Sequence, residues 1–154
     1  MTRSDPAPSA PPGPGRPSAE PTTYLVVAGA HLRGEPLHPA LLALGARFVR
    51  ATRTAPVYRM IALPALDRPA TPARPGLVRD PSGGEALEVE LYELPVAALG
   101  HLVVAVAPPL AIGTVLLAGD ASALGFVREG YAAGGRPDIS HFGGWRGYLA
   151  AAGS

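Results

Sequence analysis

The most regular hydrophobic pattern in the chain is an alternation over residues 87–94, LEVELYEL. Leucine and valine occupy every second position at its start, and Glu88 and Glu90 lie between them. A period of two is typical of a β-strand with one buried face and one solvated face. We therefore expect a strand here, with Glu88 and Glu90 side by side on the solvated face.

A second strong signal is the continuous apolar run at residues 23–28, TYLVVA, which favours a central strand buried on both faces. Gly29 follows it directly, and glycine permits a tight turn or a close backbone approach after a strand. Shorter β-favouring segments predict further strands at residues 47–53, 57–63, 76–79, 113–118 and 123–129. The last two are joined through Gly119 and Asp120, a favoured pair for a hairpin turn.

Helical spacing of apolar residues is found in three short segments, residues 39–44, 95–106 and 145–151. The first begins with proline at a first-turn position and stops at Gly45. The second also begins with proline, and its spacing favours a helix despite the β-branched residues in its second half. Many strands with few short helices predict an α+β fold, a small mixed β-barrel or curled sheet rather than alternating βαβ units.

Residues 1–22 differ in composition from the rest of the chain. They contain seven prolines among alanine, serine and glycine, with no aliphatic periodicity. Such a segment has too little apolar surface to offset the entropy of ordering it. We expect a disordered tail over residues 1–22 and one folded domain over residues 23–154, and deletion of the tail should leave the melting temperature unchanged.

Composition excludes several classes of function. The chain has no cysteine, and its net charge of +1 comes from scattered arginines and acids, which argues against a disulfide scaffold and against nucleic acid as a partner. The longest apolar run, residues 102–112, is interrupted by two prolines and is too short to span a membrane. There is no secretory signal, no spaced metal cluster and no nucleotide-binding motif. We expect a cytoplasmic protein without metal, cofactor or membrane partner.

Among the four histidines, His31 has the strongest case for a functional role. It follows the buried strand at residues 23–28, where a side chain can face a pocket while the sheet holds the backbone. A pocket residue and a satisfied structural histidine both remain open for it. His38, His101 and His141 are expected to be structural or exposed.

Arginine recurs at every third position in one strand, at Arg47, Arg50 and Arg53. Side chains three apart in a strand point to opposite faces, so Arg50 should be separated from the other two. An inward guanidinium needs an acidic partner or an anionic ligand, because an unpaired buried charge is costly. Both partners remain open, and Tyr58 and Arg74 could line the same cavity.

Seven segments of the chain, in order, resemble the C-terminal domain of allophanate hydrolase. They are VAGAHLRGEPL at 27–37, LGARFVR at 44–50, RTAPVYR at 53–59, RPGLVR at 74–79, ELYELP at 90–95, PLAIGTV at 109–115 and FGGWRGYL at 142–149. Together they cover nearly everything from Tyr24 to Ala151.

The resemblance implies a γ-glutamylcyclotransferase-like barrel with Gly29, Ala30, His31 and Leu32 in the substrate-binding loop. Cyclotransferases carry a catalytic glutamate after the strand and helix that match residues 87–106, but the chain continues APPL there, so cyclotransferase activity is not expected. In allophanate hydrolase this domain follows an amidase and is implicated in decarboxylating N-carboxycarbamate, a step that involves a histidine matching His31. The chain has no room for that amidase, so a separate amidase is an expected partner.

Two functions follow from these observations. In the first, His31 donates a proton, with an ordinary pKa of ~6.5, to an N-carboxylated urea derivative whose carboxylates are bound by Arg50 and Tyr58, with Arg74 as a further candidate. In the second, the same pocket belongs to a non-catalytic module that binds a small dicarboxylate or pairs with a separate amidase. The resemblance also implies a homodimer, because the family's domain belongs to a dimeric enzyme.

Overall fold

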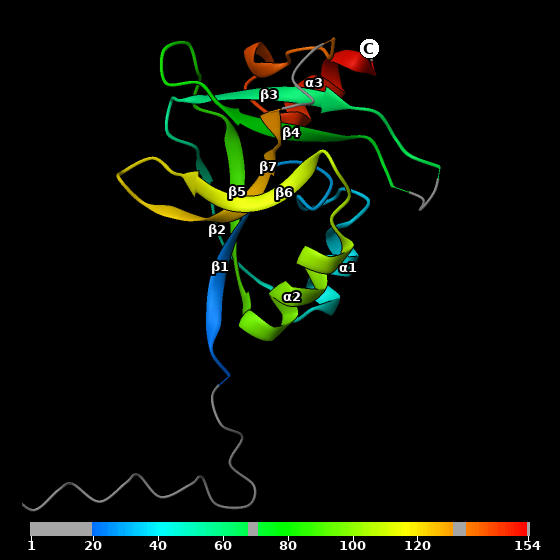
Figure 1. The fold of residues 1–154 in the computed structure, drawn as a ribbon, viewed down its shortest axis with the longest axis vertical. Coiled ribbons are helices and arrows are strands. Elements are labelled where there is room, and N and C mark those ends of the chain that lie inside the picture. Colours follow the sequence, from blue (N-terminus) through cyan, green and yellow to red (C-terminus); the bar gives the residue numbers. More distant parts are fainter. Residues whose placement is uncertain (1–19, 68–70, 131–134, 154) are drawn as a thin grey trace, which may run out of the picture.

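A computed structural model describes residues 20–67, 71–130 and 135–153 of the chain (Figure 1). Most of the expected tail, residues 1–19, therefore lies outside the described residues. Strand β1 begins at Thr22, one residue before the expected strand, and the Pro21 carbonyl accepts a hydrogen bond from the Val96 N–H.

Seven strands form one mixed sheet in the described part of the chain. They are β1 (Thr22–Val27), β2 (Arg47–Arg53), β3 (Tyr58–Leu63), β4 (Arg74–Arg79), β5 (Glu88–Pro95), β6 (Leu110–Leu116) and β7 (Ser122–Arg128). Their order is β2-β5-β1-β7-β4-β3, and β6 pairs with β7 outside this path. β1 is central, as expected, with β5 antiparallel on one side and β7 parallel on the other.

Strand β7 is the point at which the sheet curls. It pairs along its whole length with β6, whereas its opposite edge pairs first with β1 and then, at Val127, with β4. Figure 1 shows β3 and β4 running across the upper end of the molecule, in a direction different from that of β1. Gly125 of β7 allows Val115 of β6 to pack closely against it, since a Cβ atom at Gly125 would lie 2.7 Å from a Val115 methyl carbon. The expected curled α+β sheet is confirmed.

Three α-helices and one short 3-10 helix complete the described fold. They are α1 (His38–Ala43), α2 (Val96–Ala105), η2 (Ser140–Phe142) and α3 (Trp145–Ala152). Figure 1 places α1 and α2 together beside β1, while α3 lies at the other end near β3 and β4. No helix among the described residues is long and apolar enough to cross a membrane.

Most elements lie where the sequence pattern predicted them. The hairpin turn is confirmed, because Gly119 and Asp120 both have positive φ angles, 77° and 60°. β4 differs from its expected range, since it begins at Arg74 and includes Pro75. Proline is accepted at the beginning of a strand, where a missing N–H removes few sheet hydrogen bonds. Arg74 is therefore held by the sheet and does not belong to the preceding loop.

Strand β2 contains a β-bulge that changes the expected arrangement of its arginines. Arg47 lies opposite Glu93 and Arg50 lies opposite Leu91, with Val49 as the extra residue between them. Glu93 and Leu91 share one face of β5, so Arg47 and Arg50 share one face of β2. The prediction that Arg50 is separated from Arg47 was wrong, because a bulge shifts the alternation by one residue.

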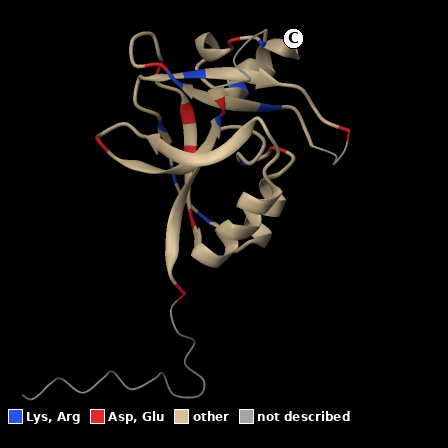
Figure 2. Cartoon of the chain, in the orientation of Figure 1, with Lys and Arg blue, Asp and Glu red and all other residues tan. Residues whose placement is uncertain are grey.

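Charged side chains are unevenly distributed over the fold. Figure 2 shows them mainly on the strands and their connecting loops, whereas α1 and α2 are almost free of them. The sequences HPALLA and VAALGHLVVA contain no Asp, Glu, Lys or Arg. The two helices therefore bring an apolar surface to the space that they enclose with the sheet.

Candidate functional site

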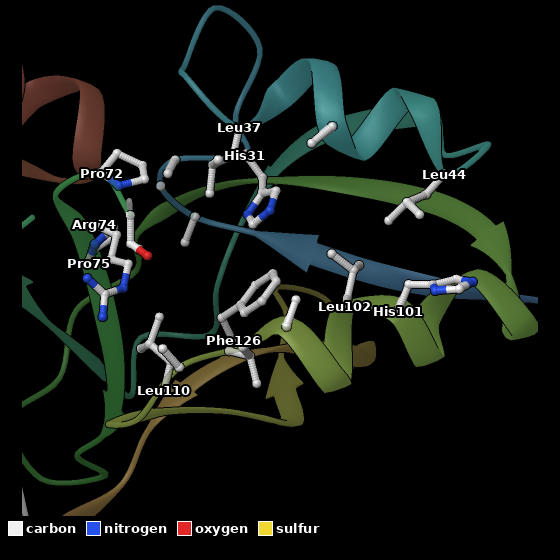
Figure 3. A pocket seen from close by; sticks show the side chains of 18 residues that line it. His31, Leu37, Leu44, Pro72, Arg74, Pro75, His101, Leu102, Leu110 and Phe126 are labelled. Atoms are coloured by element: carbon white, nitrogen blue, oxygen red, sulfur yellow. The ribbon is translucent and has the colours of Figure 1, made fainter. Parts of the chain in front are cut away.

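A pocket of about 430 Å³ lies between helices α1 and α2, the loop after β1 and the neighbouring parts of β4, β6 and β7. Figure 3 shows His31 near its middle, Arg74 at one end and His101 at the other. Most of the lining is apolar. It comprises Ala28, Gly29, Ala30, His31, Leu37, Ala40, Leu44, Thr71, Pro72, Arg74, Pro75, His101, Leu102, Ala105, Val106, Ala107, Leu110 and Phe126.

The imidazole of His31 is fixed against a wall of this pocket. Its ring stacks on Phe126 of β7, with 5.0 Å between the centroids and an angle of 8° between the planes. Burial, together with the nearby charge of His38, lowers the pKa of His31 to about 4. The free pocket therefore holds a neutral imidazole near pH 7, which differs from the proton donor with an ordinary pKa that the sequence predicted.

The low pKa makes the free energy of unfolding sensitive to acid. In the unfolded chain His31 takes up a proton with a pKa of 6.5, whereas in the folded protein it does so with a pKa of about 4. Stability is unaffected above that range and falls as the pH drops through it. Urea titrations should show wild-type protein losing about 2 kcal/mol more than His31→Gln between about pH 7.5 and pH 5. Equal losses in the two proteins would contradict the buried neutral imidazole.

Arg74 brings a positive charge to the other end of the pocket. Its side chain is buried, with the residue 6% exposed, and burial lowers its pKa. Within the described part of the chain its one hydrogen bond runs from Nη1 to the Pro64 carbonyl, 3.0 Å away, and no acidic side chain lines the pocket. A buried guanidinium without a carboxylate partner favours the binding of an anion.

Gly29 sets the distance between His31 and Arg74. A Cβ atom at this position would lie 2.1 Å from Cδ of Pro75 and 2.5 Å from its Cγ. The loop that carries His31 therefore passes directly over the residue that follows Arg74. Only glycine fits this approach, which agrees with the sequence-based interpretation of Gly29 as a close-approach position.

Three other predicted site residues do not line the pocket. Arg50 is exposed on the edge strand β2. Tyr58 is 1% exposed, and its hydroxyl accepts hydrogen bonds from the Leu116 N–H at 2.8 Å and from Arg79 at 3.3 Å. Leu32 is 1% exposed and belongs to the hydrophobic core. The expected grouping of His31 with Arg50 and Tyr58 is therefore not observed, while Gly29, Ala30, His31 and Arg74 do come together.

The environment of Glu90 differs most from the one that its sequence pattern predicts. It was expected on a solvated face, but it is 0% exposed and receives hydrogen bonds from two arginines. Arg33 donates its backbone N–H and its Nε, both at 2.9 Å, and Arg146 donates Nη2 at 3.0 Å. Tyr92 donates its hydroxyl at 3.2 Å and lies 3.0 Å from Nε2 of His38. This Glu90 network joins β5, α3 and the loop that carries His31.

The network keeps Glu90 ionised. Burial alone would raise its pKa, but the hydrogen bonds from Arg33 and Arg146 outweigh burial and bring the pKa below its ordinary value. Burial and the charge of Glu90 raise the pKa of Tyr92 to about 12, so this hydroxyl remains a donor. The loop after β1 is therefore anchored by a permanent charge two residues beyond His31.

Arg128, at the end of β7, is a second buried arginine. It is 6% exposed, and within the described part of the chain its Nε, Nη1 and Nη2 atoms have no hydrogen-bond partner. Burial and the charge of Arg136 lower its pKa. A buried cation without a partner destabilises the folded state.

Replacement of Arg128 by methionine should therefore stabilise the protein. Methionine keeps the length of the side chain and removes the unpaired charge, which is expected to raise the free energy of unfolding by about 1 to 2 kcal/mol. Denaturant titrations should compare it with Arg50→Met, a change on the exposed edge strand that should be nearly neutral. Destabilisation by Arg128→Met would mean that this guanidinium is paired in solution.

Comparisons with known proteins identify the domain. A family model described as the allophanate hydrolase C-terminal domain matches residues 23–150. Urea amidolyase of Saccharomyces cerevisiae is 37% identical over 138 residues, which cover 86% of this chain and 7% of that protein. The chain therefore spans about 7% of the length of the curated relatives it matches.

Solved structures agree with this assignment. Allophanate hydrolase of Kluyveromyces lactis matches with a TM-score of 0.77 and 34% identity over 86% of this chain and 22% of that one. A protein specific to uropathogenic Escherichia coli matches with a TM-score of 0.75 and 35% identity over 84% of this chain and 97% of that one. An uncharacterized protein of Pyrococcus horikoshii, 20% identical with a TM-score of 0.55, shares the fold. The chain belongs to the allophanate hydrolase C-terminal domain family.

Proposed function

We propose that the chain binds an N-carboxylated urea derivative in the pocket and promotes its decarboxylation, as a step of urea or allophanate degradation. The observation that carries this proposal is the placement of His31 and Arg74 in one largely apolar pocket, with His31 held against Phe126. Relatives whose names refer to urea amidolyase and allophanate hydrolase support the substrate class. N-carboxycarbamate is the expected substrate.

Decarboxylation requires that the carboxylate of the ligand is bound and that the nitrogen atom left behind receives a proton. Arg74 binds the carboxylate through a charge-assisted hydrogen bond. The negative charge of the ligand favours the imidazolium form of His31, so binding is accompanied by uptake of a proton from solvent. The carbon–nitrogen bond then breaks, CO₂ leaves, and the electron pair left on nitrogen takes the proton from His31. The neutral imidazole is restored.

The apolar lining contributes to the same reaction. A carboxylate is poorly solvated against alanine, leucine and proline side chains, whereas CO₂ carries no charge and loses little in such surroundings. The pocket therefore favours CO₂ over the carboxylate group from which it forms. Because carbamates also lose CO₂ spontaneously, the expected acceleration is modest, roughly a hundredfold from proton donation.

The relatives place this domain within larger proteins, and a separate amidase is the proposed partner that supplies the substrate. The test combines purified amidase with allophanate and follows bicarbonate release with and without this chain. Release should be faster with the wild type, and His31→Ala or Arg74→Met should abolish the effect. Arg50→Ala should leave it intact, because Arg50 lies outside the pocket.

Unchanged release in the presence of folded wild-type protein would remove decarboxylation from the proposal. A non-catalytic module that binds a carboxylate beside an amidase would then be the function to test. Calorimetry with malonate tests that module, because it requires malonate to bind in an Arg74-dependent manner even where bicarbonate release is unchanged. Proton uptake on binding would show that His31 becomes charged.

A further inference from the structure

We propose that Arg128 is a second carboxylate-binding residue of this site, and that Arg128 and Arg74 together hold the one carboxylate that the reaction retains. The other carboxylate, which leaves as CO₂, then lies against the apolar lining beside His31. This inference rests on the proposed function, because it names a further residue that binds N-carboxycarbamate. It is supported by the face of the sheet that Arg128 occupies, by its lack of a partner and by the distribution of charge along the pocket.

The side chain of Arg128 lies on the face of β7 that forms the pocket. Phe126, which stacks on His31, precedes Arg128 by two residues, and residues two apart in a strand point to the same face. The pairing of β7 with β6 is continuous up to Arg128, so no bulge interrupts this alternation. The residue paired with Arg128 in β6 is Leu110, which also lines the pocket. Arg128 is therefore adjacent to two lining residues.

From β7 the side chain of Arg128 crosses strand β4 at Gly76. A Cβ atom at Gly76 would lie 2.9 Å from Cβ of Arg128 and 3.3 Å from its Cδ. Gly76 and Arg74 are two apart in β4, so the space that Gly76 leaves open is on the face that carries the Arg74 side chain. Figure 3 shows Arg74 and Leu110 at the same end of the pocket. The two arginines therefore belong to one end of the site.

The guanidinium group of Arg128 has no hydrogen bond to lose when it turns toward a ligand. Arg128 is 6% exposed, and its three side-chain nitrogen atoms have no partner in the described part of the chain. It does not line the pocket of the free protein. A carboxylate at Arg74 would attract this unpaired cation, and the ion pair with its hydrogen bonds would offset the cost of burying both charges. We expect the Arg128 side chain to turn toward the pocket when an anion binds.

The distribution of charge determines which carboxylate leaves. A carboxylate held by two guanidinium groups is stabilised as an anion, which opposes its conversion to CO₂. The middle of the pocket disfavours charge, since burial lowers the pKa of His31 to about 4. The carbon–nitrogen bond therefore breaks at the carboxylate beside His31, and the electron pair left on nitrogen takes the proton from His31. The product carbamate keeps the carboxylate that Arg74 and Arg128 hold.

Binding of malonate and acetate to the full chain tests this assignment. Both ligands are unreactive, and they carry two carboxylates and one. Calorimetry for malonate and NMR titration for acetate should show that Arg128→Met weakens both by about tenfold or more, because each ligand places a carboxylate at the two arginines. Arg128→Lys should restore part of the affinity.

Arg136→Met is the matched control. Arg136 is exposed, does not line the pocket, and lies near enough to Arg128 for its charge to lower the pKa of Arg128. The substitution therefore removes the same charge from the same region without removing a ligand contact. Both ligands should bind to Arg136→Met as they bind to the wild type.

A double-mutant cycle shows whether the two arginines hold the same carboxylate. If they do, Arg74→Met and Arg128→Met together should weaken malonate by less than the product of their separate effects. Thermal melts give a further measurement that a purely structural role would not change. Arg128→Met should be the more stable protein without ligand, whereas saturating malonate should raise the melting temperature of the wild type by more.

Bicarbonate release in the amidase assay shows which carboxylate Arg128 binds. A group that binds the retained carboxylate acts on the ground state and the transition state alike. Arg128→Met should therefore slow release when the substrate is supplied at a low rate, and release should recover when the supply is high. Release faster than that of the wild type at high supply would mean that Arg128 holds the leaving carboxylate, and would overturn the assignment.

The remaining outcomes separate the inference from the proposed function. Arg74-dependent binding of malonate that is unchanged in Arg128→Met, or equally weakened in Arg136→Met, would overturn the role of Arg128 and leave the proposed function standing. So would a loss of malonate affinity without a loss of acetate affinity. Bicarbonate release that the wild type does not accelerate would overturn decarboxylation, while the binding measurements still decide the role of Arg128. Absence of binding for both ligands to folded wild-type protein would overturn both proposals.

Discussion

Replacement of Glu90 by glutamine should destabilise the protein by about 3 kcal/mol. Glutamine keeps the shape of the side chain, so no cavity forms, but it removes the charge that Arg33 and Arg146 share. One oxygen acceptor becomes an NH₂ group that faces other donors, and the two guanidinium groups lose their common partner. Denaturant titration at neutral pH should show a lower transition midpoint with an unchanged slope.

Glu93→Gln is the matched control, because it lies on the same strand and also loses an ion pair with an arginine. The partner there, Arg47, has a side chain that is 77% exposed, so the expected loss is below about 1 kcal/mol. Acidification provides a second check. The stabilisation that follows from the lowered pKa of Glu90 is present above pH 4.5 and is lost as the pH falls further. The free energies of unfolding of the wild type and Glu90→Gln should therefore converge in acid. Equal stability of Glu90→Gln and wild type at neutral pH would contradict a buried ionised network.

The same substitution should affect the proposed site without touching it. Glu90 receives the backbone N–H of Arg33, and Arg146 donates to the Arg33 carbonyl at 2.9 Å, so the loop is held from both sides. His31 precedes Arg33 by two residues. Loosening this anchor is expected to weaken the stacking of His31 on Phe126 and therefore to raise the pKa of His31 toward its ordinary value. NMR titration of the imidazole would detect that change.

The hydrophobic pattern was sufficient for most of the fold because strands and helices here follow local rules. The alternation at residues 87–94 gave β5, and the glycine and aspartate at 119 and 120 gave the hairpin between β6 and β7. The bulge in β2 was missed since it depends on pairing with β5 and leaves no mark in local composition. The start of β4 was missed because proline is usually read as a strand breaker.

The candidate site was predicted in part for a similar reason. Gly29, Ala30 and His31 directly follow a buried strand, so their location depends on one element. The partners of His31 come from distant segments, and nothing local indicates that Phe126 stacks on it or that Arg74 shares its pocket. A period of two also assigns Glu90 to a face without showing that α3 covers this face, which is why a buried ion pair was interpreted as solvated.

Gly29→Ala is expected to cost about 3 kcal/mol and to abolish carboxylate binding together with any rate effect. The added methyl group would lie 2.1 Å from Cδ of Pro75, and a proline ring cannot turn away as a flexible side chain does. Either the loop after β1 or the first residues of β4 must move. Since the loop carries His31 and the strand carries Arg74, any relief of the clash changes the distance between the two groups that the proposed reaction uses.

Gly100→Ala separates this effect from a general intolerance of alanine. Gly100 lies within α2, and no atom outside its own helix lies within 4 Å of where its Cβ would be. Alanine has the higher helix propensity, so this substitution should stabilise the protein by up to about 1 kcal/mol while malonate binds as before. Thermal melts should show a lower melting temperature for Gly29→Ala and a higher one for Gly100→Ala, with binding lost in Gly29→Ala alone. This result would show that the site requires the close approach of the loop after β1 to strand β4. A Gly29→Ala protein of normal stability and normal affinity would mean that the loop can lie further from Pro75, and that the His31 to Arg74 spacing is set elsewhere.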